Sequence, residues 1–406
     1  MIVSPTRFEP ALGQRHPSRS AERLAETRAL QTAFARFPTI EALRASAEGP
    51  RLAERAAALL DVVHLHAPAT PPPGAAEAAT LRVVHWNIEH GNWYEQVETA
   101  LREHAVLSTA DVVMLNEVDL GCARAGNRDV TADLADALGF HAAFTPMFIE
   151  STLGRDDDEA CAAGLANEES LVGVSVLSRW PIGDVRLVPL PGPEAIQFDL
   201  ERMVGRFVAL VCEVLHPEAP FLAVSVHLEV HRARVHREQQ MGALMAALEV
   251  EQRPIVLAGD FNSHTFDRGL WNSTWSSAVP LLTWSDRALG ERFTRPDRGP
   301  HREGVFDALA SAGFSWSEFS DHAPTLDVRF NRLDEVKQLP GPLQRLTRSG
   351  LDWLERRARL RLDWIAARSF VAAGPAPSGA TALGLDGPGR ASDHAPIAAS
   401  LAWPAR

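Results

Sequence analysis

The residues with the clearest chemical potential follow a short aliphatic run near the middle of the chain. Ile255-Val256-Leu257 leads into Ala258-Gly259-Asp260-Phe261-Asn262. Side chains two positions apart in a strand point to the same face, so Asp260 and Asn262 are predicted to project together from the carboxyl end of a buried strand. The Asp260 carboxylate can act as a general base or metal ligand, and the Asn262 amide can donate a hydrogen bond to an anionic oxygen. A turn is the simpler alternative, because Gly, Asp and Asn all favour turns.

Polar residues also follow two apolar runs nearer the N-terminus. Asn87 comes directly after residues 81–86, and Glu117 comes soon after residues 111–115. An acidic side chain at the end of an apolar strand carries a desolvation cost unless a partner compensates for it. A salt bridge is one such partner, and a hard divalent cation such as Mg²⁺ is another.

A histidine, His227, closes the apolar run at residues 221–226, and His231 and His236 follow it. Three histidines at this spacing raise the possibility of a zinc site. No glutamate stands where a zinc protease motif requires it, and no cysteine is near. A phosphate-contacting His227 is therefore preferred over zinc, with a buried structural histidine as the remaining alternative.

The C-terminal part contains Asp363 after Arg361-Leu362, and then Asp393-His394 before a final apolar run. A carboxylate paired with an imidazole fixes the tautomer of the ring and raises its basicity. Residues 320–324 repeat the Ser-Asp-His-Ala-Pro sequence of residues 392–396. Only the later copy leads into a chain-closing strand, so His394 is preferred over His322 as the functional histidine.

The elements that must position these residues are predicted from apolar periodicity. Helices are expected at 94–104, 129–138 and 303–312, and strands at 81–86, 111–115, 174–177, 208–211, 221–226, 255–257, 363–366 and 397–401. Strands and helices interleave without strict alternation, which favours a pair of mixed sheets. Residues 1–66 are predicted to form an N-terminal helical extension, 67–79 a Pro/Ala linker, and 80–406 the catalytic domain.

Composition narrows the class of protein. The 406 residues have a formal net charge of −12 and are 46% apolar, as in ordinary globular proteins. No apolar stretch is long enough to span a membrane, and no secretory signal is recognisable. With three scattered cysteines, a reduced cytoplasmic location is expected. The acidic charge argues mildly against long nucleic acid as the substrate.

These segments, in this order, resemble the endonuclease/exonuclease/phosphatase superfamily, which has the DNase I-like fold. The resemblance extends from about residue 81 to 401, and Asp119-Leu120-Gly121, Arg124 and Leu177–Ile182 strengthen it. It implies a four-layer α/β/β/α sandwich of two mixed β-sheets, here preceded by the helical extension. One departure is Gly173-Val174-Ser175, where family members often carry Gly-Asn-Ala.

The resemblance also implies roles for the metal and phosphate ligands. Glu117 resembles the principal Mg²⁺ ligand, with Asn87 and Asp393 completing the metal contacts and Mn²⁺ as an acceptable substitute. Asn262 and His227, with Asn87, resemble the residues that hold the phosphoryl oxygens.

The remaining implied roles are catalytic. Asp260 resembles the base that orients or deprotonates the attacking water, and His394, oriented by Asp363, resembles the group that stabilises the transition state. The expected function is a Mg²⁺-dependent hydrolase of phosphate esters that uses in-line attack of water.

Four points stay open at this stage. The substrate is a nucleic acid, a phospholipid or a small phosphorylated metabolite. The alternatives to a Mg²⁺-dependent hydrolase are a non-catalytic binding scaffold on the same fold and a zinc hydrolase. The arginine-rich segment from Arg345 to Arg368 reads as a solvated amphipathic helix or as an anion- or membrane-facing element. The oligomeric state is not predicted.

Overall fold

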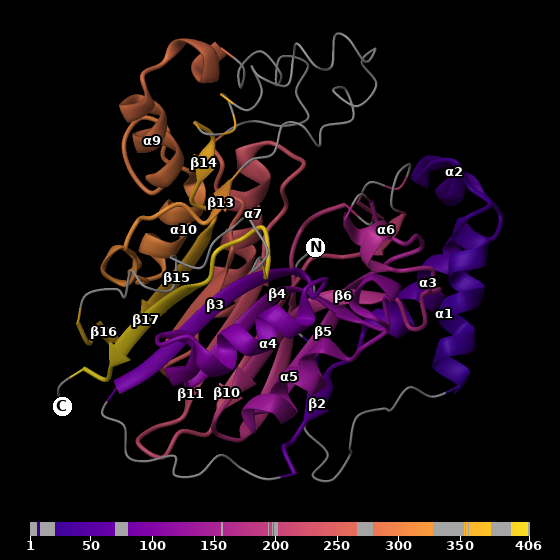
Figure 1. Ribbon diagram of the computed structural model, residues 1–406, viewed down its shortest axis with the longest axis horizontal. Coiled ribbons are helices and arrows are strands. Elements are labelled where there is room, and N and C mark those ends of the chain that lie inside the picture. The colour runs from indigo at the N-terminus through magenta and orange to yellow at the C-terminus, as the bar shows by residue number, and fades with distance from the viewer. Residues whose placement is uncertain are drawn as a thin grey trace.

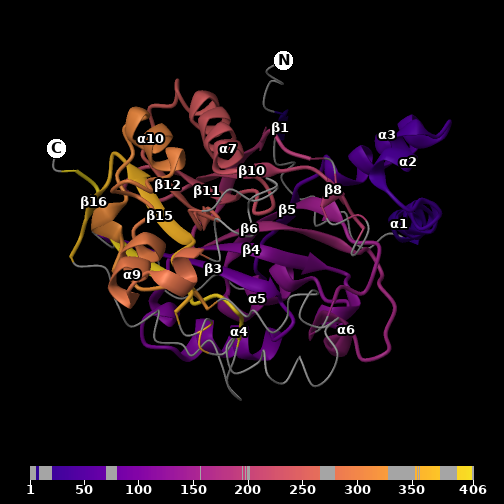
Figure 2. The same ribbon diagram turned by 90° about the horizontal axis from the view of Figure 1, so that it is seen from above.

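Two mixed β-sheets pack face to face in the computed structural model, with helices on both outer faces (Figure 1). Seen from above, α7 and α10 lie on one side, the two sheets lie in the middle, and α4 and α5 lie on the other side (Figure 2). The predicted four-layer α/β/β/α sandwich is confirmed. The structure describes residues 6–8, 21–69, 80–155, 157–193, 195–196, 198, 202–265, 279–327, 353, 355, 357–374 and 391–404.

The first sheet, sheet A, has six strands within the described part of the chain. In spatial order they are β1 (Thr6–Phe8), β7 (Ile182–Pro189), β10 (Val208–Val214), β11 (Phe221–His227), β12 (Ile255–Asp260) and β15 (Asp363–Arg368). Only the β11–β12 pair is parallel. The carboxyl ends of β11 and β12 therefore lie side by side, next to the start of β15.

The second sheet, sheet B, has nine strands by the same count. In order they are β16 (Val371–Ala372), β17 (Ile397–Ala402), β3 (Thr80–His90), β4 (Val112–Leu120), β6 (Leu171–Ser178), β5 (His141–Ile149), β9 (Met203–Gly205) and β8 (Ala195–Ile196), while β2 (His64–His66) pairs with β5. Strands β3 and β4 are parallel, so their carboxyl ends meet at one edge as well. A two-stranded sheet joins β13 (Leu326–Asp327) and β14 (Arg359–Leu360).

The helices connect and cover these strands. The α-helices are α1 (Ala21–Phe34), α2 (Ile40–Ala45), α3 (Gly49–Leu60), α4 (Tyr94–Glu103), α5 (Val130–Leu138), α6 (Asp157–Cys161), α7 (Arg234–Ala247), α9 (Asp286–Thr294) and α10 (Gly304–Ser311). Short 3-10 helices span Leu107–Thr109, Ala123–Ala125 and Ser317–Phe319. None of the helices described has the length and apolarity needed to cross a bilayer.

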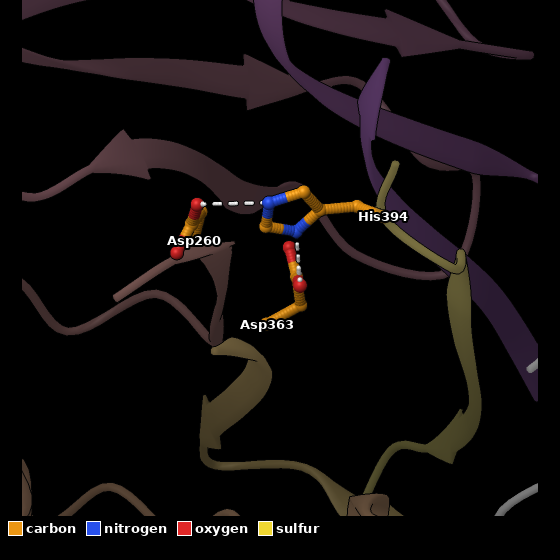
Figure 3. Close-up of side chains that lie close together, drawn as sticks. All are labelled: Asp260, Asp363 and His394. Atoms are coloured by element: carbon orange, nitrogen blue, oxygen red, sulfur yellow. Dashed lines mark hydrogen bonds and ion pairs between the residues drawn. The ribbon is translucent and has the colours of Figure 1, made fainter. Parts of the chain in front are cut away.

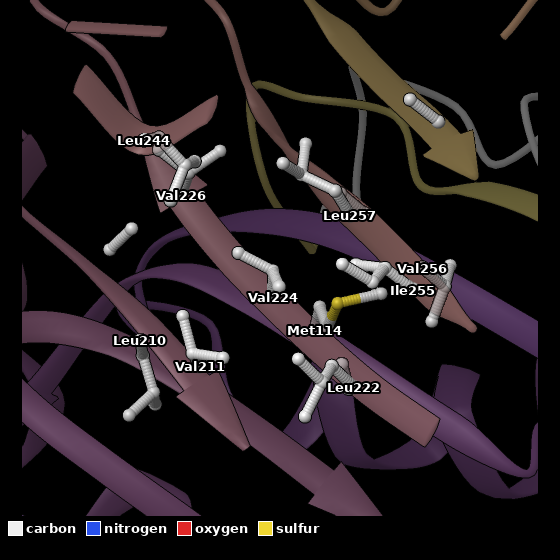
Figure 4. Close-up of a cluster of buried hydrophobic side chains, with 14 of the residues drawn as sticks. Met114, Leu210, Val211, Leu222, Val224, Val226, Leu244, Ile255, Val256 and Leu257 are labelled. Carbon is white, nitrogen blue, oxygen red and sulfur yellow. The ribbon is translucent and has the colours of Figure 1, made fainter. Parts of the chain in front are cut away.

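The main core lies between the two sheets. Met114 of sheet B lies beside Leu222 and Val224 of sheet A, as Figure 4 shows, and Leu257 belongs to the same buried cluster. Every residue of β12 is buried, which explains its continuous apolar run in place of an alternating pattern. A second apolar cluster lies between sheet B and its covering helices. The strand ends that carry polar residues are thus fixed by packing on both faces.

The N-terminal helices pack against the end of sheet B (Figure 1). Leu30 of α1 and Leu52 of α3 belong to the same apolar cluster as Trp86 of β3. Thr39 caps α2 by accepting a hydrogen bond from the Ala42 backbone, a role that threonine commonly has directly before a helix. The helical pattern expected up to His66 ends earlier, at Leu60, and residues 64–66 form strand β2 because they pair with β5.

Several sequence expectations fall on segments that the structure does not describe. Residues 70–79 of the predicted linker lie outside the described residues, and so do residues 328–352 and 375–390. The sequence also predicts a helix over residues 343–357. Most of that range, and much of the segment from Arg345 to Arg368, lies outside the described residues too. Of its arginines, Arg357, Arg359, Arg361 and Arg368 are described, and Arg361 is buried in ion-pair contact with Asp321.

Candidate functional site

Five of the predicted site residues stand at strand ends that meet along one edge of the sandwich. Asn87 lies near the end of β3, Glu117 lies in β4, and His227 and Asp260 are the last residues of the parallel strands β11 and β12. Asp363 is the first residue of β15 and is the direct register partner of Asp260. Because parallel strands place their carboxyl ends at one edge, the fold brings these side chains together from both sheets.

The backbone is irregular where the polar residues occur. The β3–β4 pairing shifts register between Asn87 and His90, and the β4–β6 pairing shifts between Leu115 and Val118. Glu117 has φ of 49° and Asn262 has φ of 50°, in the left-handed region that non-glycine residues seldom occupy. Bulges re-aim side chains at sheet edges, and such local strain is concentrated at functional sites. These two residues are held in place by the surrounding structure at some cost in stability.

Asn87 connects the two carboxylates at the centre of the site. Its Nδ2 donates to Glu117 Oε1 at 2.9 Å and to Asp260 Oδ2 at 3.3 Å. Its Oδ1 accepts a hydrogen bond from the backbone of Glu89 at 3.2 Å. The side chain is fully buried, so its orientation is set by these contacts.

Asp260 is surrounded by groups that carry or donate protons. Its Oδ2 lies 3.7 Å from His394 Nε2 and 3.7 Å from His227 Nε2. Its Oδ1 accepts a hydrogen bond from the Asn262 backbone at 2.8 Å. Burial raises the pKa of Asp260, and the nearby Asp363 carboxylate raises it further, against the opposing effect of the two histidines. A carboxylate whose basicity is raised in this way suits proton abstraction from water.

His394 lies between two carboxylates, as Figure 3 shows. Its Nδ1 is 2.7 Å from Asp363 Oδ2, and its Nε2 faces Asp260. Burial lowers the pKa of His394, but the Asp363 charge and hydrogen bond outweigh burial and raise it well above the ordinary value. Burial also opposes ionisation of Asp363, yet His394 and His85 hold its pKa below the usual range. The pair predicted from sequence is thus present as a buried, hydrogen-bonded unit.

Glu117 lies among Asn87, His90 and His227. His90 Nε2 is 3.4 Å from Glu117 Oε2, and His227 Nε2 is 3.9 Å from Glu117 Oε1. Burial favours the neutral acid, but His90 and His227 lower the pKa of Glu117. His90 also lies 3.4 Å from Asp119, and burial of His90 is outweighed by the two carboxylates, which raise its pKa to about 9.

Asn262 uses its side chain locally. Its Nδ2 donates to the Leu228 carbonyl at 2.8 Å, and its backbone N–H donates to Asp260. In this arrangement Asn262 ties the end of β12 to the segment that follows His227. One N–H of the Asn262 amide is engaged with this carbonyl, and Nδ2 carries a second N–H that no described hydrogen bond occupies.

A divalent cation fits the oxygen donors of this edge. The Glu117 side chain is 26% exposed, so its carboxylate is accessible, unlike the buried Asp260 and Asp363. The Asp393 side chain is part-exposed and makes no hydrogen bond or ion pair with any residue that the structure describes, and its backbone N–H is tied to Glu89 at 3.0 Å. Mg²⁺ prefers one or two carboxylates together with water or phosphate oxygens, which this set offers.

A tighter group of possible ligands consists of Asp260, Asp363 and His394, whose ligand atoms lie within 4.8 Å of one another. Asp363 Oδ2 already lies 2.7 Å from His394 Nδ1. That contact suits the group to orientation of the imidazole and proton transfer. Within the described residues it is the one such group of three or more, so His227, His231 and His236 form no zinc cluster.

The residue that follows the earlier Ser-Asp-His-Ala-Pro copy, Thr325, bonds to the backbone on both sides of the candidate site. Thr325 accepts hydrogen bonds on Oγ1 from the backbone of Leu362 at 3.1 Å and of Asp363 at 3.3 Å. The Thr325 carbonyl accepts from Ala395, next to His394. His322 itself lies against Trp364 with ring centroids 6.2 Å apart, and no described hydrogen bond or ion pair joins it to Asp260, Asp363 or His394.

Sequence reasoning missed His85, His90 and Thr325. His85 Nε2 lies 2.9 Å from Asp363 Oδ1. One signal was available for it, because His85 is two positions before Asn87 and so shares its face of the strand. The departure at Ser175 has a local explanation, since its Oγ is 2.5 Å from Thr131 Oγ1 in α5, on the helix-covered face of sheet B.

Comparisons with known proteins bear on this arrangement. Residues 84–322 match the profile of the family described as Endonuclease/Exonuclease/phosphatase family. No curated protein sequence matches this chain.

Three solved structures illustrate the structural likeness. An endonuclease/exonuclease/phosphatase from Beutenbergia cavernae DSM 12333 is 20% identical with a TM-score of 0.47, over 80% of this chain and 72% of that chain. The human Nocturnin catalytic domain with bound sulfate anion is 16% identical with a TM-score of 0.46, over 80% and 94%. The 3′ phosphatase NExo from Neisseria bound to a product DNA hairpin is 17% identical with a TM-score of 0.46, over 80% and 100%.

Proposed function

This chain belongs to the endonuclease/exonuclease/phosphatase family, and from that premise we propose that it is a Mg²⁺-dependent hydrolase of phosphate esters. The observation that carries the proposal is the convergence of Glu117, Asn87 and Asp260 with the His394–Asp363 pair at one edge of the sandwich. A binding scaffold without catalysis has no need for a buried carboxylate of raised pKa that faces a carboxylate–imidazole pair.

In the proposed reaction, Asp260 accepts a proton from water as the new phosphorus–oxygen bond forms and the bond to the leaving oxygen breaks. His394 donates a hydrogen bond from Nε2 to the phosphoryl group, and Asp363 keeps its ring in place through Nδ1. Asn87 and His227 lie beside Asp260, and together with Asn262 they would contact the phosphoryl oxygens. Positioning and charge neutralisation carry most of the rate in such displacements.

Glu117 and Asp393, with Asn87, would hold the cation. When bound, Mg²⁺ neutralises the charge that develops on the phosphoryl oxygens and the leaving oxygen. Mn²⁺ has similar ligand preferences and is expected to substitute for it. Asp260 and His394 would act on the proton and the phosphoryl group in either case.

For the substrate, we favour a small or lipid-like phosphate ester over long nucleic acid. The chain has a net charge of −12, and a polyanion pays a repulsive cost to approach such a surface unless a local basic patch compensates. Both monoesters and diesters fit the chemistry proposed above.

The test is turnover of a phosphate-ester panel with Mg²⁺: abasic DNA, single-stranded DNA and RNA, sphingomyelin, inositol phosphates and simple diesters. We expect D260N and E117Q to lower kcat on the turned-over ester by about 10²- to 10⁴-fold. D184N, which removes an exposed carboxylate on β7, is the matched control and should keep full activity. Metal stripping should abolish turnover, and Mg²⁺ or Mn²⁺ should restore it.

Absence of turnover on every ester, or equal turnover by D260N, would overturn the proposal and leave the binding scaffold. Restoration by Zn²⁺ with no response to Mg²⁺ or Mn²⁺ would show that the metal assignment is wrong.

A further inference from the structure

We propose that His85 is a positioning residue that holds Asp363, and through it His394, in the reactive orientation. The proposal rests on the proposed function, because it assigns His85 a part in the same reaction. His85 contacts neither the space for the phosphoryl group nor the candidate metal ligands through its side chain. Its effect on the reaction would pass through the Asp363 carboxylate.

The first observation is that both oxygens of Asp363 are held by imidazoles. Oδ1 lies 2.9 Å from His85 Nε2, and Oδ2 lies 2.7 Å from His394 Nδ1. All atoms of the Asp363 and His85 side chains are fully buried. A carboxylate bound on one oxygen alone can still rotate about its last bond, whereas hydrogen bonds to both oxygens fix its plane. The direction of the Asp363 Oδ2 lone pair, and hence of the His394 ring, is set by His85.

The second observation is that His85 is itself fixed. Its Nδ1 lies 3.0 Å from the carbonyl oxygen of Met114 in β4. Met114 is the register partner of His85 and is three residues before Glu117. The ring is therefore anchored to the backbone of the strand that carries the candidate metal ligand.

The third observation is that the contact joins the two sheets. His85 belongs to β3 of sheet B, and Asp363 belongs to β15 of sheet A. Asn116 of β4 makes a similar link, because its Oδ1 accepts a hydrogen bond at 2.8 Å from the Asp260 backbone in sheet A. Apolar packing between sheets is not directional, whereas hydrogen bonds are. The His85–Asp363 contact thus fixes the position of Asn87 and Glu117 relative to Asp363 and His394.

A purely structural role is the competing explanation, since loss of a buried hydrogen bond lowers stability wherever it lies. The two explanations differ in what they change in the folded enzyme. Loss of positioning lowers kcat with little change in KM, because the substrate still binds but the reacting groups are misaligned. Loss of stability alone leaves both constants of the folded fraction unchanged.

The experiment uses the full chain and compares H85L, H85Q, D363A and the double variant H85L/D363A. We expect H85L to lower kcat by about 10- to 100-fold, the usual effect of removing a partner that orients a functional side chain, with KM changed by less than about threefold. H85Q should recover much of kcat, because its amide N–H can still donate to Asp363 Oδ1. H85L should have little further effect once Asp363 is absent.

The matched control is H216L, which removes a buried histidine that packs between Trp180 and Trp403, away from the site. It should lower thermal stability and leave kcat unchanged. Equal kcat in H85L and wild type, or additive effects of H85L and D363A, would overturn the positioning role. If H85L does not fold, H85Q decides: a kcat at wild-type level supports donation to Asp363, and a kcat as low as in D363A excludes it.

A second readout separates this proposal from the proposed function. The proton that joins His394 to Asp363 is expected to give a protected, far-downfield imidazole signal, which H394N should remove. Positioning by His85 predicts that H85L shifts or loses this signal and that H85Q retains it. An unchanged signal in H85L would reject the positioning role even in an active enzyme. A shifted signal in a protein without turnover on any ester would support it while the proposed function fails.

Discussion

At the scale of single residues, the site shifts the pKa values of two carboxylates in opposite directions, although the two residues are direct register partners. Asp260 has a raised pKa and Asp363 a lowered one, although both are buried at the same edge. The difference arises because Asp363 holds two imidazoles by hydrogen bonds, whereas Asp260 faces its histidines at 3.7 Å and feels the Asp363 charge. Environments that drive two like groups apart in pKa also give them different chemical roles.

His322 gives a prediction on pH dependence. Burial, with Arg295 and Arg361 nearby, lowers the pKa of His322 from 6.5 to about 4. Between these values the unfolded chain binds a proton that the folded chain does not, so His322 makes the protein less stable as pH falls from 6.5 towards 4. We expect H322Q to lose less unfolding free energy than wild type over this window, and to match it in pH dependence near pH 7. Denaturant unfolding at a series of pH values measures both, and parallel pH profiles would contradict the prediction.

His85 and Thr325 show why the residue list from sequence was incomplete. Motif reasoning identified residues that follow apolar runs, because strand ends at a sheet edge are visible locally. The spacing of His85 from Asn87 indicates a shared strand face, but the partner of His85 lies 278 positions away and has no signal in that local pattern. Thr325 follows the Ser-Asp-His-Ala-Pro copy that the sequence did not favour. Its hydroxyl accepts a hydrogen bond from the backbone N–H of Asp363, a contact that no side-chain motif indicates.

At the scale of elements, the site depends on two parallel strand pairs, β3–β4 and β11–β12, whose carboxyl ends lie at the same edge. The helices flanking the first two functional strands were predicted to within one residue, as 94–104 and 129–138 against α4 (Tyr94–Glu103) and α5 (Val130–Leu138). Strand β5 was missed because it contains Pro146 and two consecutive alanines, and β7 because charged residues interrupt it near a sheet edge. The bulges at Glu117 and Asn87 also have no signal in sequence, since they arise from pairing with neighbouring strands.

The segment after the earlier Ser-Asp-His-Ala-Pro copy is predicted to be a support for β15. Replacing Thr325 by valine keeps its shape and removes the acceptor for two buried backbone N–H groups. We expect T325V to lower the unfolding free energy by about 1–3 kcal/mol and to reduce kcat through displacement of Asp363. T283V, at an exposed threonine whose hydroxyl donates within its own helical turn, is the control and should change stability little. A T325V protein as stable as T283V would exclude the supporting role.

At the scale of the whole molecule, residues from both sheets form the candidate site within an acidic protein. The fold class was predictable because the sequence contains many strands, several of which end in polar residues. The order of these polar residues along the chain matches that of a known family. The substrate was not, because the residues proposed to contact a phosphoryl group indicate a class of reaction and say nothing about the rest of the ester. The segments 266–278 and 328–352, which fall between β12 and β15, lie outside the described residues.

Ionic strength tests the favoured substrate class. With a net charge of −12, we expect turnover of a small diester to change by less than about threefold between roughly 50 and 200 mM salt. A protein that grips nucleic acid through several phosphate contacts loses about 10³- to 10⁵-fold in affinity over that range. Initial rates at subsaturating substrate, with single-stranded DNA measured in parallel, give the comparison. If DNA is turned over faster than the small diester at low salt, and if its turnover falls steeply as salt is raised, nucleic acid is the substrate.

The position of β17 next to β3 has a consequence for how the protein is made. The Trp86 indole bonds to the carbonyl of His394, 308 positions later, and Ser392 bonds to the Asn87 carbonyl. During synthesis, β3 is made long before His394 and β17, so β3 lacks its outer neighbour and the candidate site lacks His394 until those residues have left the ribosome. A nascent or prematurely terminated chain is therefore expected to be inert towards phosphate esters, with the edge of β3 exposed to chaperones and to aggregation.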